Sequence, residues 1–127
     1  MYKFTLAIFL TIGVPLAMAN PRQDWANATY ASIRVSKTEG DLVGLRVQII
    51  HSNIQNFILI QSFEGEPLAP CLAKAEISKN TIYAKFPEGC LFKGEMLGEI
   101  KKSTLSIIFA PEQGKDNGKV MVLNLIK

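Results

Sequence analysis

Apolar and polar residues alternate in short runs from Ala28 almost to the end of the chain. A period of two residues is typical of strands that bury one face, because successive side chains point to opposite sides of a sheet. Turn-forming residues separate the runs, and no segment has the apolar period of a helix. The pattern predicts an all-β protein with about eight strands, at 28–36, 42–50, 57–63, 72–78, 81–86, 90–97, 104–110 and 119–126.

The alternation also predicts which side chains are buried. The run at 57–63 has large apolar residues on both faces, so we expect a central strand or a strand that borders a cavity. In the first two runs the expected buried residues are Ala31, Ile33 and Val35, followed by Leu45, Val47 and Ile49.

Eight sequential strands with short connections fit two architectures. Pairing of each strand with the next one favours a small closed antiparallel barrel. The last run, 119–126, is apolar on both faces, which favours a paired strand over a bare sheet edge. We therefore predict one barrel domain over residues 20–127, with a β-sandwich as the alternative.

Residues 1–19 have the features of a secretory signal peptide. Lys3 precedes an apolar run at 4–16, and Ala17-Met18-Ala19 is a small-x-small cleavage site. The apolar run is shorter than the roughly 20 residues of a membrane-spanning helix. We expect cleavage after Ala19 and a secreted or periplasmic domain without a stable membrane anchor.

Cys71 and Cys90 are the two cysteines of the chain, and in a secreted protein they are expected to form one structural disulfide. A hairpin that sets Cys71 opposite Cys90 also sets Glu76 opposite Lys85, and such opposite charges stabilise a strand pair. A slip of two residues would instead set Lys74 against Lys85.

A second geometry for the disulfide is also open. Residues 87–89, Pro-Glu-Gly, have the composition of a turn. Cys90 could therefore begin the following strand and reach Cys71 around a corner.

The charges argue against a polyanionic partner. The net charge is +3, with both signs interspersed along the chain. The one adjacent cationic pair, Lys101 and Lys102, has the features of a solvated turn. Nucleic acids and anionic membrane surfaces are therefore not the expected partners.

No combination of residues predicts catalysis, a metal or a cofactor. His51 is the single histidine and lies in a turn, without a nucleophile motif nearby. The cysteines are used by the disulfide, which removes thiol catalysis and soft-metal sites. The carboxylate pairs at 39/41, 64/66 and 95/99 lie in or beside turns, where a solvated surface is the ordinary interpretation. We predict that the protein is not an enzyme.

A non-enzymatic binding protein is the function that remains. Its partner is expected to be another secreted or periplasmic protein, bound by loops on the rigid scaffold, as in an inhibitor or protective factor. The two most polar loops are 64–67 and 111–118, and their candidate contact residues are Glu64, Glu66, Pro67, Glu112, Lys115 and Asp116.

The alternative function is a carrier of a small apolar ligand. An eight-stranded barrel can just enclose one small ligand. The residues that would line such an interior are Phe57, Leu59 and Phe63.

Two features near the start of the domain have open interpretations. Trp25 either closes one end of the core or contacts a partner. Asn27-Ala28-Thr29 matches the acceptor pattern for N-glycosylation, which matters only in a eukaryotic host.

In size and strand rhythm the chain resembles lipocalin-like barrels and the periplasmic lysozyme inhibitors. Gln23 stands where the lipocalin Gly-x-Trp motif has its glycine, and the Ser-Gly-x-x-Tyr motif of the inhibitors is absent. No residue role is therefore carried over from either group.

Overall fold

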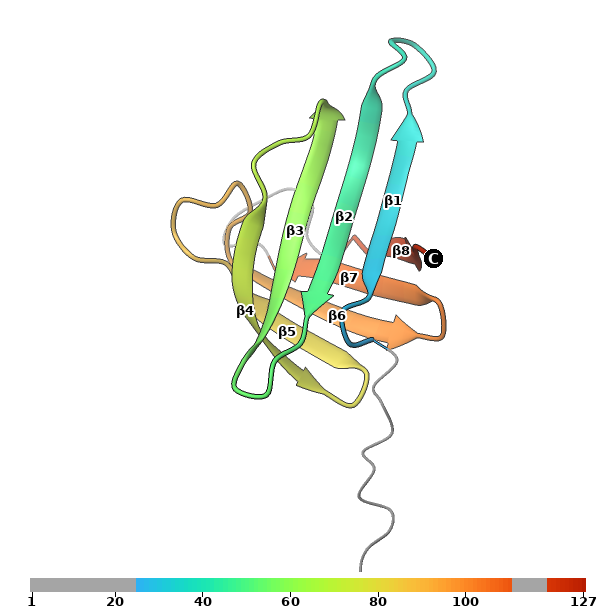
Figure 1. Cartoon of the computed structure of the whole chain (residues 1–127). Coiled ribbons are helices and arrows are strands. Elements are labelled where there is room, and N and C mark those ends of the chain that lie inside the picture. The colour runs from blue at the N-terminus through green and yellow to red at the C-terminus, as the bar shows by residue number, and fades with distance from the viewer. Residues whose placement is uncertain (1–24, 111–118) are drawn as a thin grey trace, which may run out of the picture.

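Eight antiparallel strands form a closed barrel in this computed structural model, which describes residues 25–110 and 119–127 (Figure 1). Each strand pairs with the next, and β1 closes the sheet against β8, so the predicted all-β barrel is confirmed over the sandwich. The proposed signal peptide lies outside the described residues. The strands are β1 (Thr29–Val35), β2 (Leu42–Ile50), β3 (Asn56–Gly65), β4 (Cys71–Ser78), β5 (Thr81–Lys85), β6 (Glu95–Lys101), β7 (Thr104–Ala110) and β8 (Met121–Leu125).

The barrel is flattened into two layers that cross each other. In Figure 1, β1, β2 and β3 run side by side, and β6 and β7 cross behind them. β4 belongs to both layers, because Cys71–Ala75 pairs with β3 whereas Ala75–Ser78 pairs with β5. A strand that changes partner in this way forms the corner of an orthogonally packed sheet.

Apolar side chains fill the interior of the barrel. Within the described ranges no polar or charged residue belongs to the buried set. No helix in these ranges has the length and apolarity needed to cross a membrane. Close packing of the apolar side chains leaves the interior of the barrel occupied by the protein itself. The largest fully buried side chains are Tyr30, Val47, Ile49, Ile58, Ile60, Ile82, Met96, Leu105, Ile107 and Leu123.

Aromatic side chains cover two regions at the margin of the core. Trp25 is 6% exposed, and its ring meets that of His51 edge to face at 5.5 Å. Elsewhere Phe86, Phe92 and Phe109 form a group, in which the rings of Phe92 and Phe109 stack at 5.5 Å. Trp25 is therefore part of the core, which favours the first of its two interpretations.

The buried face of β1 differs from the sequence prediction. Tyr30 is buried, whereas Ile33 and Val35 are exposed and Ala31 is only partly buried. Tyr30 pairs with the buried Val47, so it shares the interior face with it. The predicted face was wrong because Ala31, Ile33 and Val35 pair with Arg46, Gly44 and Leu42 on the outer face, and alternation alone does not show which face of a strand points inward.

The register of the β4–β5 hairpin also differs from the prediction. Glu76 pairs with Tyr83, and not with Lys85. The turn determines this register, because Lys79 and Asn80 form a two-residue loop in which Lys79 has a φ of 55°, as the first position of a primed hairpin turn requires. The strands part beyond Ala75 and Ala84, so the lysines at 74 and 85 are not held face to face.

The disulfide between Cys71 and Cys90 is confirmed, with the two Cα atoms 5.5 Å apart. Cys71 is the first residue of β4, and Cys90 lies in the connection between β5 and β6. The prediction of a strand at 90–97 was wrong, because β6 begins at Glu95. The disulfide therefore joins β4 to a loop and does not cross a hairpin.

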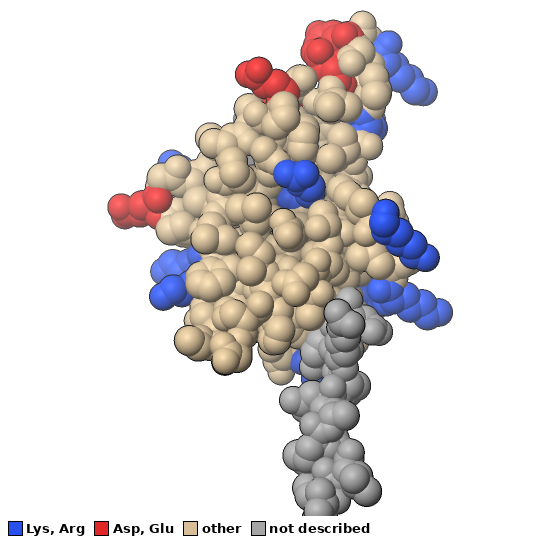
Figure 2. Space-filling model, in the orientation of Figure 1, with Lys and Arg blue, Asp and Glu red and all other residues tan. Residues whose placement is uncertain are grey.

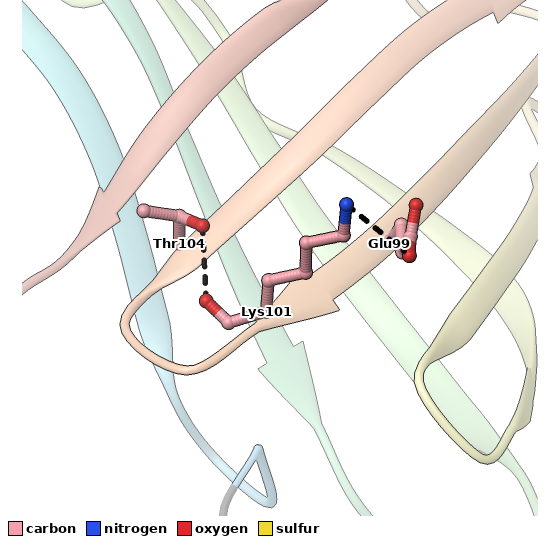
Figure 3. Close-up of polar contacts among 3 residues, drawn as sticks. All are labelled: Glu99, Lys101 and Thr104. Atoms are coloured by element: carbon pink, nitrogen blue, oxygen red, sulfur yellow. Dashed lines mark hydrogen bonds and ion pairs between the residues drawn. The ribbon is translucent and has the colours of Figure 1, made fainter.

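The β6–β7 turn contains the adjacent lysines noted in the sequence. Thr104 Oγ1 donates a hydrogen bond of 3.0 Å to the carbonyl oxygen of Lys101, and Lys101 Nζ lies 3.7 Å from Glu99 Oε1 (Figure 3). Lys102 is exposed in the turn itself. An ion pair as exposed as this one contributes little to stability.

We expect the Cys71→Ala/Cys90→Ala double variant to lose about 3 kcal/mol of unfolding free energy, the chain-entropy value for a closed loop of about 20 residues. Urea unfolding of the oxidised wild type and of the variant measures this difference. Reduced wild-type protein is the control and should match the variant. Equal stability of the oxidised and reduced wild type would contradict the prediction.

Gly44 permits a close approach between β1 and β2. Its φ is +150°, and a Cβ atom at this position would overlap the carbonyl oxygen of Ser32 and lie 2.7 Å from the Cα atom of Ile33. Both obstacles are backbone, which a rotamer change cannot relieve. Phe63, which pairs with Gly44 on β3, is 8% exposed.

We expect Gly44→Ala to destabilise the protein by about 3 kcal/mol or more, from steric overlap and backbone strain together. Gly40→Ala is the matched control, because Gly40 also has a positive φ, +71°, but has no atom within 4 Å of its would-be Cβ. The control should lose only about 1 kcal/mol. Urea unfolding distinguishes the two, and equal losses would show that the contact with β1 is unimportant.

Candidate functional site

One end of the molecule projects beyond the core. This projecting end consists of Ser32–Val35 of β1, the turn at 36–41, Leu42–Gly44 of β2 and residues 63–67 at the end of β3. Figure 1 shows it as the upper tip of the front layer. Regular pairing continues almost to the tip, because Val35 still pairs with Leu42. The projection is therefore an ordered extension of the sheet.

β1 has an open side in this region. Its pairing with β8 is limited to Tyr30 with Leu125 and Ala31 with Asn124. All four residues of Ser32–Val35 are exposed. In the part of the chain that the structure describes, only β2 pairs with them. We call Ser32–Val35 the free edge of β1.

The hydrogen-bond pattern shows which residues present their backbone to the open side. The N–H of Ser36 donates to the carbonyl of Asp41 at 2.7 Å, and the N–H of Ile49 donates to that of Ala28 at 2.9 Å. The N–H and C=O groups of the even-numbered residues, in β1 and directly beside it, therefore point toward β2. Since the bonding direction alternates along an antiparallel strand, Ile33 and Val35 present their N–H and C=O groups to the free edge.

The side chains along this edge are apolar and accessible. Ile33 is 38% exposed and Val35 60% exposed, and their neighbour Leu42 on β2 is 41% exposed. Arg34 lies between Ile33 and Val35 on the opposite face. Natural sheet edges are commonly protected by proline, charge or a bulge, because an unprotected edge pairs with other chains. The free edge has one such feature, the charge of Arg34.

The loop predicted at 64–67 lies at the same end of the molecule. Glu64 still pairs with Val43 of β2, and the chain then turns back, with the N–H of Glu64 donating to the carbonyl of Glu66 at 3.1 Å. Pro67 forms a bridge with Phe63. Figure 2 shows acidic side chains at this end of the molecule. The three predicted contact residues Glu64, Glu66 and Pro67 are all exposed.

One strand, β2, separates this loop from the free edge. Leu42 pairs with Val35 on one side and with Gly65 on the other. The structure thus brings the predicted loop together with an edge that the sequence did not indicate. The other predicted contact residues, Glu112, Lys115 and Asp116, lie outside the described residues.

The residues predicted to line a cavity lie on the outer face of β3. Phe57 and Leu59 alternate with Ile58 and Ile60, which are buried in the core. Phe63 also lies outside the core cluster, and the guanidinium carbon of Arg46 is 5.9 Å from its ring centre. The barrel interior is filled by the residues that alternate with them.

A groove lies on the outer face of β3, β4 and β5. Its volume is about 680 Å³. Phe57 contributes to it, so one of the predicted lining residues borders a cavity on the outside of the barrel. The lining residues are Gln55, Phe57, Leu72, Lys74, Glu76, Tyr83, Lys85, Phe86, Pro87 and Glu88.

Tyr83 is a titratable side chain in the lining of this groove. The pKa of its hydroxyl is raised, chiefly because the carboxylate of Glu95 accepts its hydrogen bond, with smaller contributions from desolvation and from the negative charges of Glu95 and Glu76. Loss of the proton would remove the hydrogen bond and add a third negative charge. Tyr83 therefore remains a neutral donor at physiological pH.

The described residues contain no group of three or more His, Cys, Asp or Glu side chains that could hold a metal ion. His51 is exposed, and its Nδ1 lies 2.8 Å from the side-chain oxygen of Asn56. No protein-family model, curated protein or solved structure matches this chain. The projecting end and the groove are the two candidate binding surfaces among the described residues.

We expect the Glu95→Gln variant to lower the pKa of Tyr83 toward its ordinary value, because the variant removes both the accepting carboxylate and its charge. A pH titration of the tyrosine ring carbons by NMR measures this pKa. Because folding raises the pKa of Tyr83, the protonated hydroxyl stabilises the folded state, and this stabilisation is complete at any pH below the ordinary pKa of tyrosine. It is lost as the pH rises through the pKa that Tyr83 has in the folded state. Glu99→Gln is the control, and a shift of equal size in both variants would contradict the assignment.

Proposed function

We propose that this protein is a non-enzymatic binding protein that captures another secreted or periplasmic protein by strand addition at the free edge of β1. The exposed backbone of Ile33 and Val35 carries this proposal. A sheet edge with unpaired N–H and C=O groups binds an extended segment of another chain through main-chain hydrogen bonds, and neighbouring side chains then select the sequence. Such an edge is suited to a protein partner.

The side chains at the projecting end define the chemistry of that partner. Ile33 and Val35 favour a strand with apolar residues on the same face, whereas Arg34 favours an acidic residue on the other face. A second copy of this chain fits less well. In the antiparallel register that pairs Ile33 with Val35 of the second copy, the two Arg34 side chains would face each other, and like charges destabilise such a pair.

The loop at 64–67 fits the same proposal. Glu64 and Glu66 stand three strand spacings from the incoming strand, at roughly 14 Å given the distance between neighbouring strands. They would contact the part of the partner that lies beyond the added strand. The predicted loop thus extends the interface that the free edge begins.

The alternative of a carrier that holds an apolar ligand inside the barrel has less support. Its predicted lining residues Phe57, Leu59 and Phe63 are on the outer face, and Ile58 and Ile60 fill the interior beside them. A ligand in the interior would have to displace core side chains. Binding at the outer surface requires no such rearrangement.

A secreted or periplasmic location is part of the proposal. The Cys71–Cys90 disulfide is compatible with an oxidising environment outside the cytoplasm. Residues 1–19 carry the features of a cleavable signal peptide, which supports export.

We expect the Ile33→Lys/Val35→Lys variant to lose at least about 90% of partner capture, since two charged side chains on an edge oppose strand addition. The experiment uses the oxidised mature protein as bait in the extracellular or periplasmic fraction of its own host, and quantifies each retained protein by mass spectrometry. Leu97→Lys is the matched control. Leu97 is 48% exposed on β6, which is paired on both sides.

The expected result is a protein retained by the wild type and by Leu97→Lys but not by the edge variant. Circular dichroism must first show that all three baits are folded. A partner that binds all three baits equally would overturn the strand-addition model. Absence of any retained protein would overturn the binding function itself.

A further inference from the structure

We propose that the groove on the outer face of β3, β4 and β5 is a binding site for a small amphipathic anion, with the charged head between Lys74 and Lys85 and the apolar chain on the floor of the groove. This inference goes beyond the proposed protein interface. It involves other strands and other residues, so each proposal can fail without the other.

The groove exists because β4 and β5 separate at the corner of the barrel. Their pairing ends at Ala75 and Ala84. Beyond that point Lys74 pairs with Phe57 of β3, and Lys85 pairs with Glu95 of β6. The two lysines therefore stand on opposite sides of an opening between strands, and both line the groove.

The floor of the opening is apolar. Phe86 follows Lys85 and is only 6% exposed, as a member of the core, yet it also lines the groove. Leu72, which is 50% exposed, lies on the β4 side, and Pro87 continues the β5 side. An apolar chain placed here would contact the ring of Phe86 through the gap between the strands and would shield Leu72 from water.

The charges favour an anion at the centre of the groove. Neither Lys74 nor Lys85 has an ion pair among the residues that the structure describes. Glu76 also lines the groove, but it lies where the strands are still paired, opposite Tyr83. Glu88 lies beyond Pro87 at the open end. An anion between the lysines would be attracted by both charges, whereas a cation there would be repelled by both.

The size of the groove fits a small molecule. Its volume of about 680 Å³ falls within the range of ligand pockets, roughly 300–1,000 Å³. Such pockets combine a predominantly apolar lining with a few polar groups that orient the ligand. Here Lys74 and Lys85 are the groups that would orient the ligand. The hydroxyl of Tyr83 does not have this role, because it donates its hydrogen bond to Glu95.

Titration calorimetry with two probes that share a tail tests the charge preference. The probes are dodecanoate and dodecyltrimethylammonium, each kept below its micellar concentration. We expect the wild type to bind dodecanoate about tenfold more tightly than the ammonium probe, as two weak exposed ion pairs would produce. In the Lys74→Gln/Lys85→Gln variant this preference should disappear.

Two further variants separate the head from the tail. Leu72→Asn should weaken both probes equally, because it removes apolar area without changing charge. Lys102→Gln is the matched control, since Lys102 is exposed in the distant β6–β7 turn and should leave both affinities unchanged. All variants change exposed residues, and circular dichroism verifies their fold.

The site itself is located by NMR. Dodecanoate should shift the ring signals of Phe57 and Tyr83 and leave those of Tyr30 in the core unchanged. The proposal is overturned if dodecanoate does not bind, if both probes bind equally to the wild type, or if the affinity loss is the same in Lys102→Gln as in the double lysine variant. Shifts confined to Tyr30 would also overturn it, because they would place the ligand inside the barrel.

Discussion

Closure of an eight-stranded sheet around a filled apolar interior is the constraint on which the other features of this protein depend. A short sheet closes only if strands bend or change partners, and β4 does so at Ala75, pairing with β3 on one side of that residue and with β5 on the other. The opening between Lys74 and Lys85 is a direct result. β1 and β8 pair only through Tyr30 and Ala31 of β1, so Ser32–Val35 has β2 as its one partner strand in the described part of the chain. Both candidate binding surfaces thus arise where the sheet departs from uniform pairing.

The Cys71–Cys90 disulfide reinforces the less regular of these two regions. Between Lys85 and Glu95 the chain leaves the ladder, and its return is supported by the stacking of Phe86, Phe92 and Phe109 and by the hydrogen bond from the Phe86 N–H to the carbonyl of Gly94, at 3.0 Å. The disulfide ties this connection to the start of β4. A covalent link is effective here because no ladder of backbone hydrogen bonds joins the two segments.

The sequence predicts the number of strands, their order and the disulfide, because period-two alternation and paired cysteines are local signals. It fails for the buried face of β1: Ile33 and Val35 alternate like core residues, yet they lie on the face opposite to the buried Tyr30. The repulsion expected between Lys74 and Lys85 favours a register that the structure does not have, since one sequence does not show that β4 and β5 separate at that point. Gly44 likewise gives no sign of the close approach of β1. The polarity of residues 64–67 predicts an exposed loop there, whereas a free strand edge has no composition that distinguishes it.

The closure between β1 and β8 has a consequence for how the barrel forms and opens. Every other pair of neighbouring strands is consecutive in the chain, so its loop closes early and at low entropic cost. Only the β1–β8 seam joins residues from opposite ends of the domain, and it consists of two residue pairs. The seam should therefore form last in folding and open first in fluctuations. Each opening would extend the unpaired backbone from Ser32–Val35 to Ala31 and Tyr30. The opening of the β1–β8 pairing would therefore determine how long a strand a partner can pair with.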